Sequence, residues 1–288
     1  MTAEVLAPVF DPDSGGGEEI LYLYDAVTTV GGVGGFAAVG AAEVAQFQAE
    51  GYMIVEDAFS PEAVADGLQG IIDLLDGRAE GFRGVQFEAS ARDLLPTLDA
   101  DAKQDHVRKL SSFVEYDTRL KALADDPRLL AVLAQLMGAT PTLFQDIALL
   151  KPPLVGREKP WHQDNAFFNL PPETPVIGVW IALDEALIEN GCMHIIPGSQ
   201  GEGPIVHWKR RDWQICDTDV QTRRVVAVPL RPGSLLFFHG LLHHGTPPSR
   251  SPRRRRAVQY HYAPDNVVHI SGEEHRAIFG SEGKDAQC

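Results

Sequence analysis

The stretch RVVAVPLRPGSLLFFH, residues 224–239, contains two apolar runs that are separated by a turn signal, Pro232-Gly233. Both runs are short and rich in β-branched or aromatic residues, which is typical of β-strands. Comparable runs occur at about residues 141–151, 176–184, 194–197 and 255–262. Short strands with turn signals and no long helix between them predict an antiparallel β-barrel or sandwich over about residues 140–265.

The sequence before this β region has helical patterns. Apolar residues recur at helical spacing in residues 41–51. A second helix is expected to begin at Ser60, an N-cap residue followed by proline, and to run to about Leu75. A helical pair covers about residues 118–137 and is broken at Pro127. These helices are therefore expected to pack outside the β core.

The domain organisation is predicted from the absence of a linker. Residues 41–288 are expected to form one domain, and residues 1–40 a Gly-rich N-terminal extension. Two states of this extension remain open. It is either weakly ordered, or it packs against the domain through Leu21, Tyr22 and Tyr24.

Composition excludes several classes of partner. The chain has 288 residues and a net charge of −15, which argues against nucleic acid and anionic membrane surfaces as partners. The apolar stretch from Ala26 to Ala42 is broken by five glycines and is too short to span a bilayer. The scattered cysteines, Cys192, Cys216 and Cys288, indicate neither a zinc site nor a disulfide framework. We expect a cytoplasmic protein that binds a small molecule; no oligomeric state is predicted.

Two histidine-containing segments are candidates for metal binding. In Trp161-His162-Gln163-Asp164, the imidazole and the carboxylate are two residues apart, so an extended backbone directs both to the same side. The segment from His239 to Thr246 contains His243 and His244, and each is a candidate third ligand. Two histidines and one carboxylate form the facial arrangement of non-haem Fe(II) oxygenases.

An arginine-rich segment, residues 250–256, contains five arginines and leads into a predicted strand. Because a strand directs alternate residues inward, one or two of these arginines are expected to face the barrel. A guanidinium group binds a carboxylate through a bidentate pair of hydrogen bonds, which suits a dicarboxylate ligand. The sequence therefore predicts an anion next to the metal.

Over about residues 42–265 the chain resembles the phytanoyl-CoA dioxygenase family of Fe(II)- and 2-oxoglutarate-dependent oxygenases. The resemblance lies in three segments that occur in the family's order: Lys151-Pro152-Pro153 … His162-Gln163-Asp164, Asn190-Gly191-Cys192 … Pro197-Gly198-Ser199, and His244-Gly245-Thr246 … Arg255. It implies a fold that is mainly β with flanking helices, around a double-stranded β-helix (jelly-roll, cupin-like) core.

The resemblance also implies a role for individual residues. His162, Asp164 and His244 would bind Fe(II); His244 rather than His243 has the family's spacing of eleven residues to Arg255. Arg255 would hold the distal carboxylate of 2-oxoglutarate. Further co-substrate contacts would come from Thr246, Trp180, Lys109 and Gln163. With O2, the implied reaction hydroxylates an unactivated C–H bond and releases succinate and CO2.

Two other hypotheses remain open. The chain could form a cupin-like barrel that binds a metal or small ligand without oxygenase turnover. It could also form an oxygenase-fold enzyme that performs desaturation, epimerisation or cyclisation. The presence of His162, Asp164, His244 and Arg255 together favours the enzyme.

The substrate is predicted only as a small organic molecule, with an acyl-CoA and a natural-product intermediate as examples. Asn165, Phe167 and Phe168 follow the His162–Asp164 pair and are expected at the mouth of the pocket. The alternative for the two phenylalanines is a place in the core. A basic rim for CoA would come from residues 209–211 or from spare arginines in residues 250–256.

Overall fold

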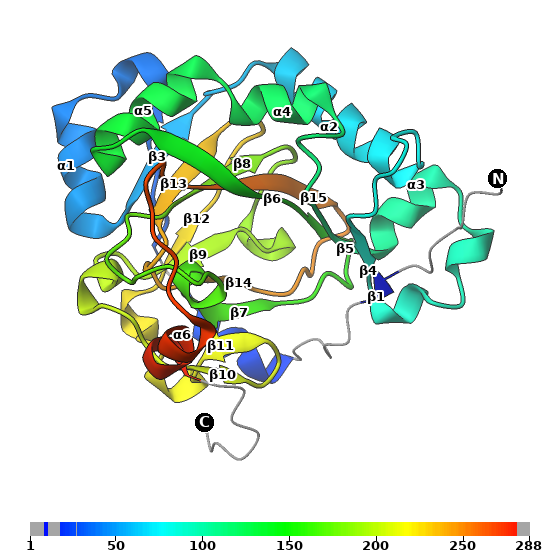
Figure 1. Cartoon of the computed structure of the whole chain (residues 1–288). Coiled ribbons are helices and arrows are strands. Elements are labelled where there is room, and N and C mark those ends of the chain that lie inside the picture. The colour runs from blue at the N-terminus through cyan, green and yellow to red at the C-terminus, as the bar shows by residue number, and fades with distance from the viewer. Residues whose placement is uncertain (1–8, 11–17, 27, 281–288) are drawn as a thin grey trace.

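A computed structural model describes residues 9–10, 18–26 and 28–280. Among these residues the strands form two layers that face each other (Figure 1) and are antiparallel except for the outermost pair at each edge of the larger sheet. The larger sheet has the strand order β1-β4-β5-β6-β15-β8-β13-β3-β2, and the smaller has the order β12-β9-β14-β7. The strands of the larger sheet are β1 Val9–Phe10, β2 Val33–Gly34, β3 Tyr52–Glu56, β4 Val85–Phe87, β5 Val107–Ser111, β6 Pro141–Lys151, β8 Ile177–Ala182, β13 Leu235–His239 and β15 Arg255–Pro264. Those of the smaller sheet are β7 Lys159–His162, β9 Met193–Ile195, β12 Val226–Val228 and β14 His244–Thr246.

The two apolar runs of residues 224–239 lie in different sheets. β12 pairs with β9 in the smaller sheet, whereas β13 pairs with β8 and β3 in the larger one. Gly233 has a φ of 84° in the connecting turn, and a Cβ there would lie 2.4 Å from the Phe59 carbonyl oxygen. The turn therefore carries the chain from one layer to the other, as a jelly roll requires. The prediction of a mainly β, double-stranded β-helix fold is confirmed.

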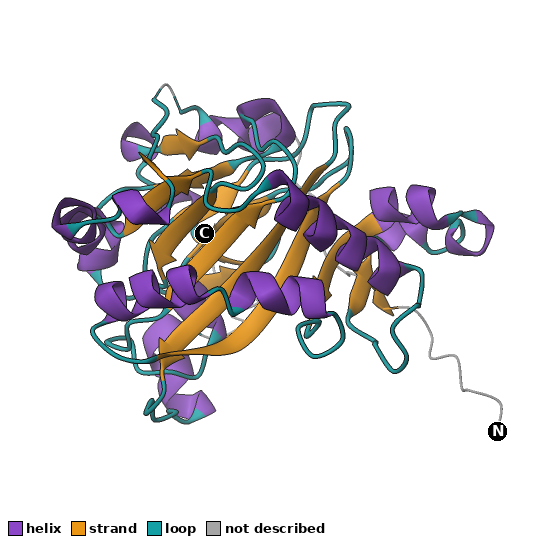
Figure 2. Ribbon diagram, turned by 90° about the horizontal axis from the view of Figure 1, so that it is seen from above, coloured by secondary structure: helices purple, strands orange, loops and turns teal. Residues whose placement is uncertain are grey.

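Helices cover the outer face of the larger sheet (Figure 2). The helices are α1 Ala41–Glu50, α2 Pro61–Leu75, α3 Ala100–Lys103, α4 Thr118–Ala124, α5 Pro127–Met137 and α6 Gly272–Phe279. As expected, the Ser60 side chain caps α2 and a proline begins α5. The hydroxyl groups of Tyr260 and Tyr262 on β15 donate to the carbonyl oxygens of Leu120 and Ala124 in α4. The bond to Ala124 satisfies a carbonyl at the end of α4, and both bonds fix the helix on the sheet.

Short elements were not predicted from the sequence. They include β7 and β14, the β10–β11 hairpin (His207–Lys209 and Trp213–Ile215) and α6. Strands of three or four residues are too short to show a clear alternation. The capping box of Ser271 and Glu274 at the start of α6 was a usable signal.

Part of the N-terminal extension contacts the smaller sheet. Residues Glu18–Tyr24 form a 3-10 helix, in which Leu23 and Tyr24 are buried and Tyr22 is exposed. The Trp161 indole N–H donates to the Leu23 carbonyl, and the Tyr24 hydroxyl donates to Glu158. Residues 1–8, 11–17 and 27 of the predicted extension lie outside the described residues.

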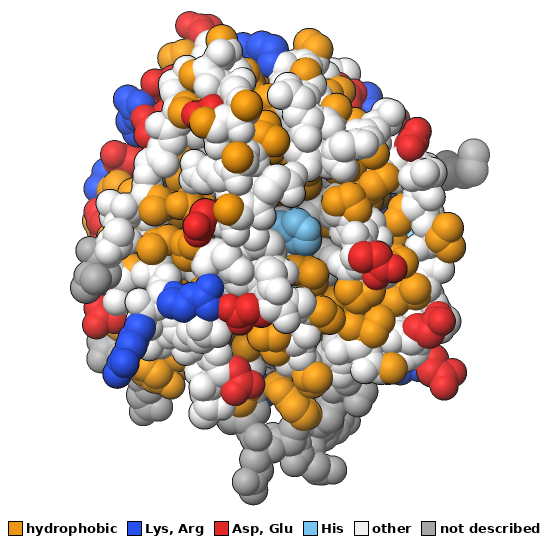
Figure 3. Space-filling model, turned by 90° about the vertical axis from the view of Figure 1, so that its left-hand side faces the viewer, with side chains coloured by type: hydrophobic (Ala, Val, Ile, Leu, Met, Phe, Trp, Pro, Cys, Tyr) orange, Lys and Arg blue, Asp and Glu red, His pale blue; other side chains and the backbone are white. Residues whose placement is uncertain are grey.

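The surface charges, the helix lengths and the cysteines relate to the partners and the redox setting that the sequence predicts. On the face shown in Figure 3, basic side chains lie toward the periphery and beside acidic ones. Within the described ranges, no helix combines the length and apolar composition that crossing a bilayer requires. Cys192 carries a buried free thiol.

Candidate active site

Two histidines and one aspartate converge at the edge of the smaller sheet. His162 ends β7 and His244 begins β14, and the two residues are direct cross-strand partners. Asp164 follows at the start of a 3-10 helix, Asp164–Phe167. Its Oδ1 lies 3.2 Å from His162 Nε2 and 3.5 Å from His244 Nε2. Candidate ligand atoms of all three residues lie within 4.8 Å of one another.

Backbone contacts orient the two imidazoles. The Nδ1 atom of His162 lies 2.7 Å from the Pro160 carbonyl oxygen, and that of His244 lies 2.9 Å from the Leu242 carbonyl oxygen. Because a carbonyl can only accept, each Nδ1 carries the hydrogen and each Nε2 keeps its lone pair. Burial and the adjacent His244 lower the pKa of His162 to about 4, so its imidazole is neutral at pH 7.

These three residues fit a divalent metal ion. Ligand atoms about 2.1 Å from a metal and at right angles to each other are about 3.0 Å apart. The distances from Asp164 Oδ1 to the two Nε2 atoms, 3.2 and 3.5 Å, are close to this value. The donor set contains two imidazoles and one carboxylate, as in non-haem Fe(II) centres. His243 is not part of this cluster.

The second oxygen of Asp164 is held by β15. Oδ2 lies 2.7 Å from His261 Nε2 and accepts a hydrogen bond of 3.2 Å from Gln259 Nε2. Burial raises the pKa of Asp164, but the nearby histidines and hydrogen bonds outweigh burial and hold this pKa well below its usual range. Asp164 is therefore an anion whose Oδ1 remains directed toward the histidines.

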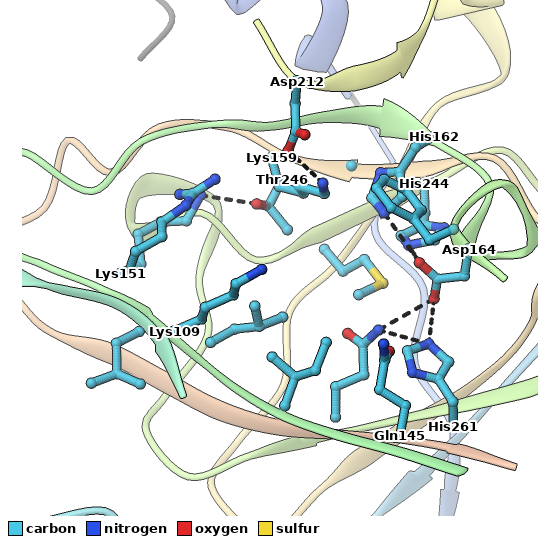
Figure 4. Close-up of a pocket in the computed structure, with 18 of the residues that line it drawn as sticks. Lys109, Gln145, Lys151, Lys159, His162, Asp164, Asp212, His244, Thr246 and His261 are labelled. Atoms are coloured by element: carbon cyan, nitrogen blue, oxygen red, sulfur yellow. Dashed lines mark hydrogen bonds and ion pairs between the residues drawn. The ribbon is translucent and has the colours of Figure 1, made fainter. Parts of the chain in front are cut away.

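A cavity of about 390 Å³ opens beside these residues (Figure 4). This volume is in the range of small-molecule sites. On the larger sheet, much of its wall comes from alternate residues of β6 and β15, namely Gln145, Ile147, Leu149, Lys151, Arg255, Gln259 and His261, and β4 and β5 add Gln86, Arg108 and Lys109. The smaller sheet and its neighbours contribute Lys159, Met193, Thr246 and Asp212.

Two buried cations lie side by side at one end of the cavity. Arg255 is directly opposite Lys151 in the pairing of β15 with β6, and each is only 3% exposed. The Arg255 guanidinium lies 5.4 Å from the centre of the Trp180 ring and donates to the Leu149 carbonyl oxygen. Its Nε has no hydrogen-bond partner among the described residues. Burial, followed by nearby Arg108, lowers the pKa of Arg255 to about 10.

This pair fits the distal carboxylate of a dicarboxylate. Like charges directly opposite each other on a sheet are destabilising. In the part of the chain that the structure describes, neither Arg255 nor Lys151 forms an ion pair with an acidic side chain. Burial, with Arg255 nearby, lowers the pKa of Lys151 well below its usual range. A bound carboxylate would supply the missing negative charge.

Of the other residues that were predicted to contact the co-substrate, some lie at the cavity and one does not. Lys109, on β5, and Thr246 line the cavity, and Trp180 packs against Arg255. Gln163 points away, because its side chain bonds to the backbone of residues 203, 205 and 241. The predicted contribution of Gln163 to co-substrate binding is therefore not supported.

The three residues that were predicted to contact the substrate also lie in different places relative to the cavity. Phe167 and Phe168 line the cavity, and Phe167 is 43% exposed at its mouth. Phe168 is buried and also packs in an apolar cluster with Leu170 and Val176, so the core interpretation holds for Phe168. Asn165 is fully buried behind the cavity against Gly240, which does not support a substrate contact.

Most of the arginines expected at a basic rim are already paired. Arg211 binds Glu158 and Asp217. The arginines at positions 253, 254 and 256 bind Glu185, Asp101 with Asp105, and Asp184, respectively. Lys209 does line the cavity. The arginine-rich segment therefore contributes Arg255 to the cavity and otherwise makes surface ion pairs.

Sequence reasoning missed Lys151, Gln259, His261 and Gln145 as residues of the site. The signal was present in part, since Lys151 belongs to the Lys-Pro-Pro motif. Alternation along β15 from Arg255 also points Gln259 and His261 to the same face. The contact of these side chains with Asp164 depends on strand packing that the local sequence does not show.

Comparisons with known proteins agree with this geometry. The family model described as Phytanoyl-CoA dioxygenase (PhyH) matches residues 47–257. A relative from Danio rerio, phytanoyl-CoA dioxygenase domain-containing protein 1, is 25% identical over 283 residues. This match covers 80% of this chain and 95% of the relative.

Solved structures show a similar fold. The structure of EctD from S. alaskensis with 2-oxoglutarate and 5-hydroxyectoine has a TM-score of 0.62 at 23% sequence identity. The match covers 85% of this chain and 81% of the EctD chain. The non-heme alpha ketoglutarate dependent carbocyclase SnoK from nogalamycin biosynthesis has a TM-score of 0.63 at 20% identity, with coverages of 84% and 91%. The family match spans most of the domain and includes His162, Asp164, His244 and Arg255. The chain therefore belongs to the phytanoyl-CoA dioxygenase family of iron- and 2-oxoglutarate-dependent oxygenases.

Proposed function

We propose that this protein hydroxylates an unactivated C–H bond of a small organic substrate, with Fe(II), 2-oxoglutarate and O2. In this proposal His162, Asp164 and His244 bind the iron, and Arg255 and Thr246 hold the distal carboxylate of 2-oxoglutarate. Lys109 and Trp180 border the same co-substrate.

The observation that carries the proposal is the juxtaposition of a facial donor set and the buried guanidinium of Arg255 in one cavity. The charges support it. Fe(II), the Asp164 carboxylate and a doubly charged co-substrate leave one negative charge, which Arg255 neutralises. Without an anion, a buried guanidinium would keep an uncompensated charge at a cost of several kcal/mol, about 3–5.

The residues of the chain bind, orient and enclose the reactants. The two Nε2 atoms and Asp164 Oδ1 would hold the metal, and its remaining coordination sites would be available to the co-substrate. Arg255 fixes one end of the co-substrate, so its keto acid end is directed toward the iron. When bound, iron and 2-oxoglutarate supply the oxidising chemistry, which releases succinate and CO2 and transfers an oxygen atom to the substrate. Phe167 and Phe168 limit access of water beside His162.

The size of the cavity limits the substrate. About 390 Å³ must accommodate the co-substrate and the reacting part of the substrate. We propose either a small natural-product intermediate or only the acyl end of a thioester within it. The paired arginines offer little support for a CoA rim. The two lysines at the cavity, Lys159 and Lys209, both pair with Asp212. A cytoplasmic location stays a prediction.

The proposal is tested by anaerobic titration of the Fe(II)-loaded protein with 2-oxoglutarate. The expected result is a visible metal-to-ligand charge-transfer band that is absent from His162→Ala. No band despite bound iron and bound 2-oxoglutarate would overturn chelation and would favour the cupin-like barrel without turnover. If the band forms, product analysis separates hydroxylation from desaturation, epimerisation and cyclisation.

A further inference from the structure

Lys151 is buried in a channel that the fold provides for it. A Cβ on Gly156 would lie 2.2 Å from Lys151 Cγ, and a Cβ on Gly191 would lie 2.7 Å from Lys151 Cδ. Gly191 also has a φ of 82°, a conformation that side chains other than glycine rarely adopt. Two glycines from separate loops therefore make room for the aliphatic part of one lysine.

The ammonium group at the end of this channel uses all of its hydrogens. Lys151 Nζ donates to the Arg157 carbonyl oxygen at 2.9 Å, to Thr246 Oγ1 at 2.9 Å, and to the Pro247 carbonyl oxygen. A protonated lysine has three N–H donors and no acceptor. Lys151 therefore has no hydrogen left for a bound carboxylate, although it lies beside the proposed carboxylate site.

The bond from Lys151 fixes the direction of the Thr246 hydroxyl. Thr246 lines the cavity, and Figure 4 shows its oxygen between Lys151 and the interior of the cavity. A hydroxyl has one hydrogen to donate. Oγ1 accepts from Lys151 Nζ, which also donates to two backbone carbonyl oxygens, so the hydrogen of Thr246 is directed away from Lys151. It is available to an acceptor in the cavity.

We propose that Lys151 is a positioning residue that directs the Thr246 hydroxyl hydrogen to the distal carboxylate of 2-oxoglutarate, without contacting the co-substrate itself. This inference rests on the proposed function, because it takes 2-oxoglutarate as the ligand beside Arg255. In it, Arg255 supplies the charge and the Lys151–Thr246 pair supplies a directed, charge-assisted hydrogen bond. A methionine at position 151 would let the hydroxyl turn toward a backbone carbonyl.

The experiment measures the dissociation constant of 2-oxoglutarate by calorimetry on Ni(II)-loaded protein, in which no turnover occurs. Lys151→Met and Thr246→Val are each expected to weaken binding about tenfold or more, the usual effect of losing a hydrogen bond to a charged group. The double variant is expected to lose no more than about twofold beyond Thr246→Val alone, because Lys151 acts through Thr246. Thr246→Ser should retain the wild-type affinity.

Controls distinguish this role from general damage. Binding of 2-oxovalerate, which lacks the distal carboxylate, is expected to be the same in wild type and Lys151→Met. The matched control is Lys121→Met, which removes an exposed lysine on α4 and should leave both affinities unchanged. If Lys151→Met does not fold, Lys151→Gln keeps a polar end group in the channel, and the same loss is expected.

Several results would overturn the inference. They are an unchanged 2-oxoglutarate affinity in folded Lys151→Met, losses that add in the double variant, and an equal loss for 2-oxovalerate. Failure of the wild type to bind 2-oxoglutarate at all would instead overturn the proposed function. The two kinds of failure are therefore separable.

Discussion

The two faces of the β6–β15 ladder differ in what they bury. On the outer face, Ala148, Leu150, Val258 and Tyr260 pack under the helices in the largest apolar cluster. On the inner face, the residues in alternation with them surround the cavity. Apolar Ile147 and Leu149 lie there beside five polar or charged residues, namely Gln145, Lys151, Arg255, Gln259 and His261. The same two strands thus contribute to the core on one side and to the site on the other.

The difference shows how the fold carries a buried charged site. Burying polar and charged groups costs free energy unless each finds a partner. Apolar contacts on the outer face stabilise the strands and so hold the inner residues in position. We therefore expect outer-face changes to alter stability and inner-face changes to alter ligand binding and activity.

The largest effect is expected at the metal ligands. His162→Ala, Asp164→Ala and His244→Ala should each reduce turnover of 2-oxoglutarate by more than about 100-fold, because even residues that only support metal ligands are worth 10–100-fold. Bound iron, measured by metal analysis, should fall in parallel, while the melting temperature of the metal-free protein should change little. His243→Ala is the matched control and should keep its iron. If His243→Ala lost iron while His244→Ala kept it, His243 would be the ligand instead.

The outer face is tested by Val258→Ala, which removes part of a buried side chain beneath the helices and does not touch the cavity. The free energy of unfolding should fall by about 1–3 kcal/mol, as for other large-to-small core changes. The inner-face control Gln145→Ala should change this free energy by less than about 0.5 kcal/mol. Denaturant titration measures both, and equal losses would contradict the separation of the two faces.

Two adjacent arginines on β15, Arg255 and Arg256, allow the two faces to be compared within one strand. Arg255→Ala should raise the dissociation constant of 2-oxoglutarate about 10- to 100-fold, because a charged hydrogen-bond donor is lost. Arg256 instead binds Asp184 through two hydrogen bonds of 2.7 Å. Arg256→Ala should lower stability by about 1 kcal/mol and leave 2-oxoglutarate binding unchanged. Unaltered binding in Arg255→Ala would place the dicarboxylate elsewhere.

The smallest effect is expected at Cys192. Burial raises the pKa of this thiol to about 12, whereas an exposed cysteine ionises near pH 8.5. At pH 8 the folded protein should therefore hold Cys192 as the unreactive thiol. Peptide mapping after iodoacetamide treatment should find Cys192 alkylated only in denatured protein. Rapid alkylation of the folded protein would show that this region between the sheets opens.

The local sequence determined much of the secondary structure. Strand β6 has the bounds expected from its apolar run, and α2 begins at its Ser60 cap. Proline at position 127 separates α4 from α5, because proline lacks the N–H that a helix interior needs. The alternation around Gln163 also placed His162 and Asp164 on one side. Each of these features depends on neighbours within a few residues.

Only the tertiary structure decided which distant side chains meet. His162 faces His244 because β7 and β14 pair in one register, although 81 residues separate them in the sequence. The register of β15 with β6 likewise sets Arg255 opposite Lys151. A shift of β15 by one residue would direct Arg255 to the outer face, away from Lys151 and the cavity. Residue spacing therefore indicates the kind of chemistry, whereas strand register, which depends on packing of the whole domain, assembles the site.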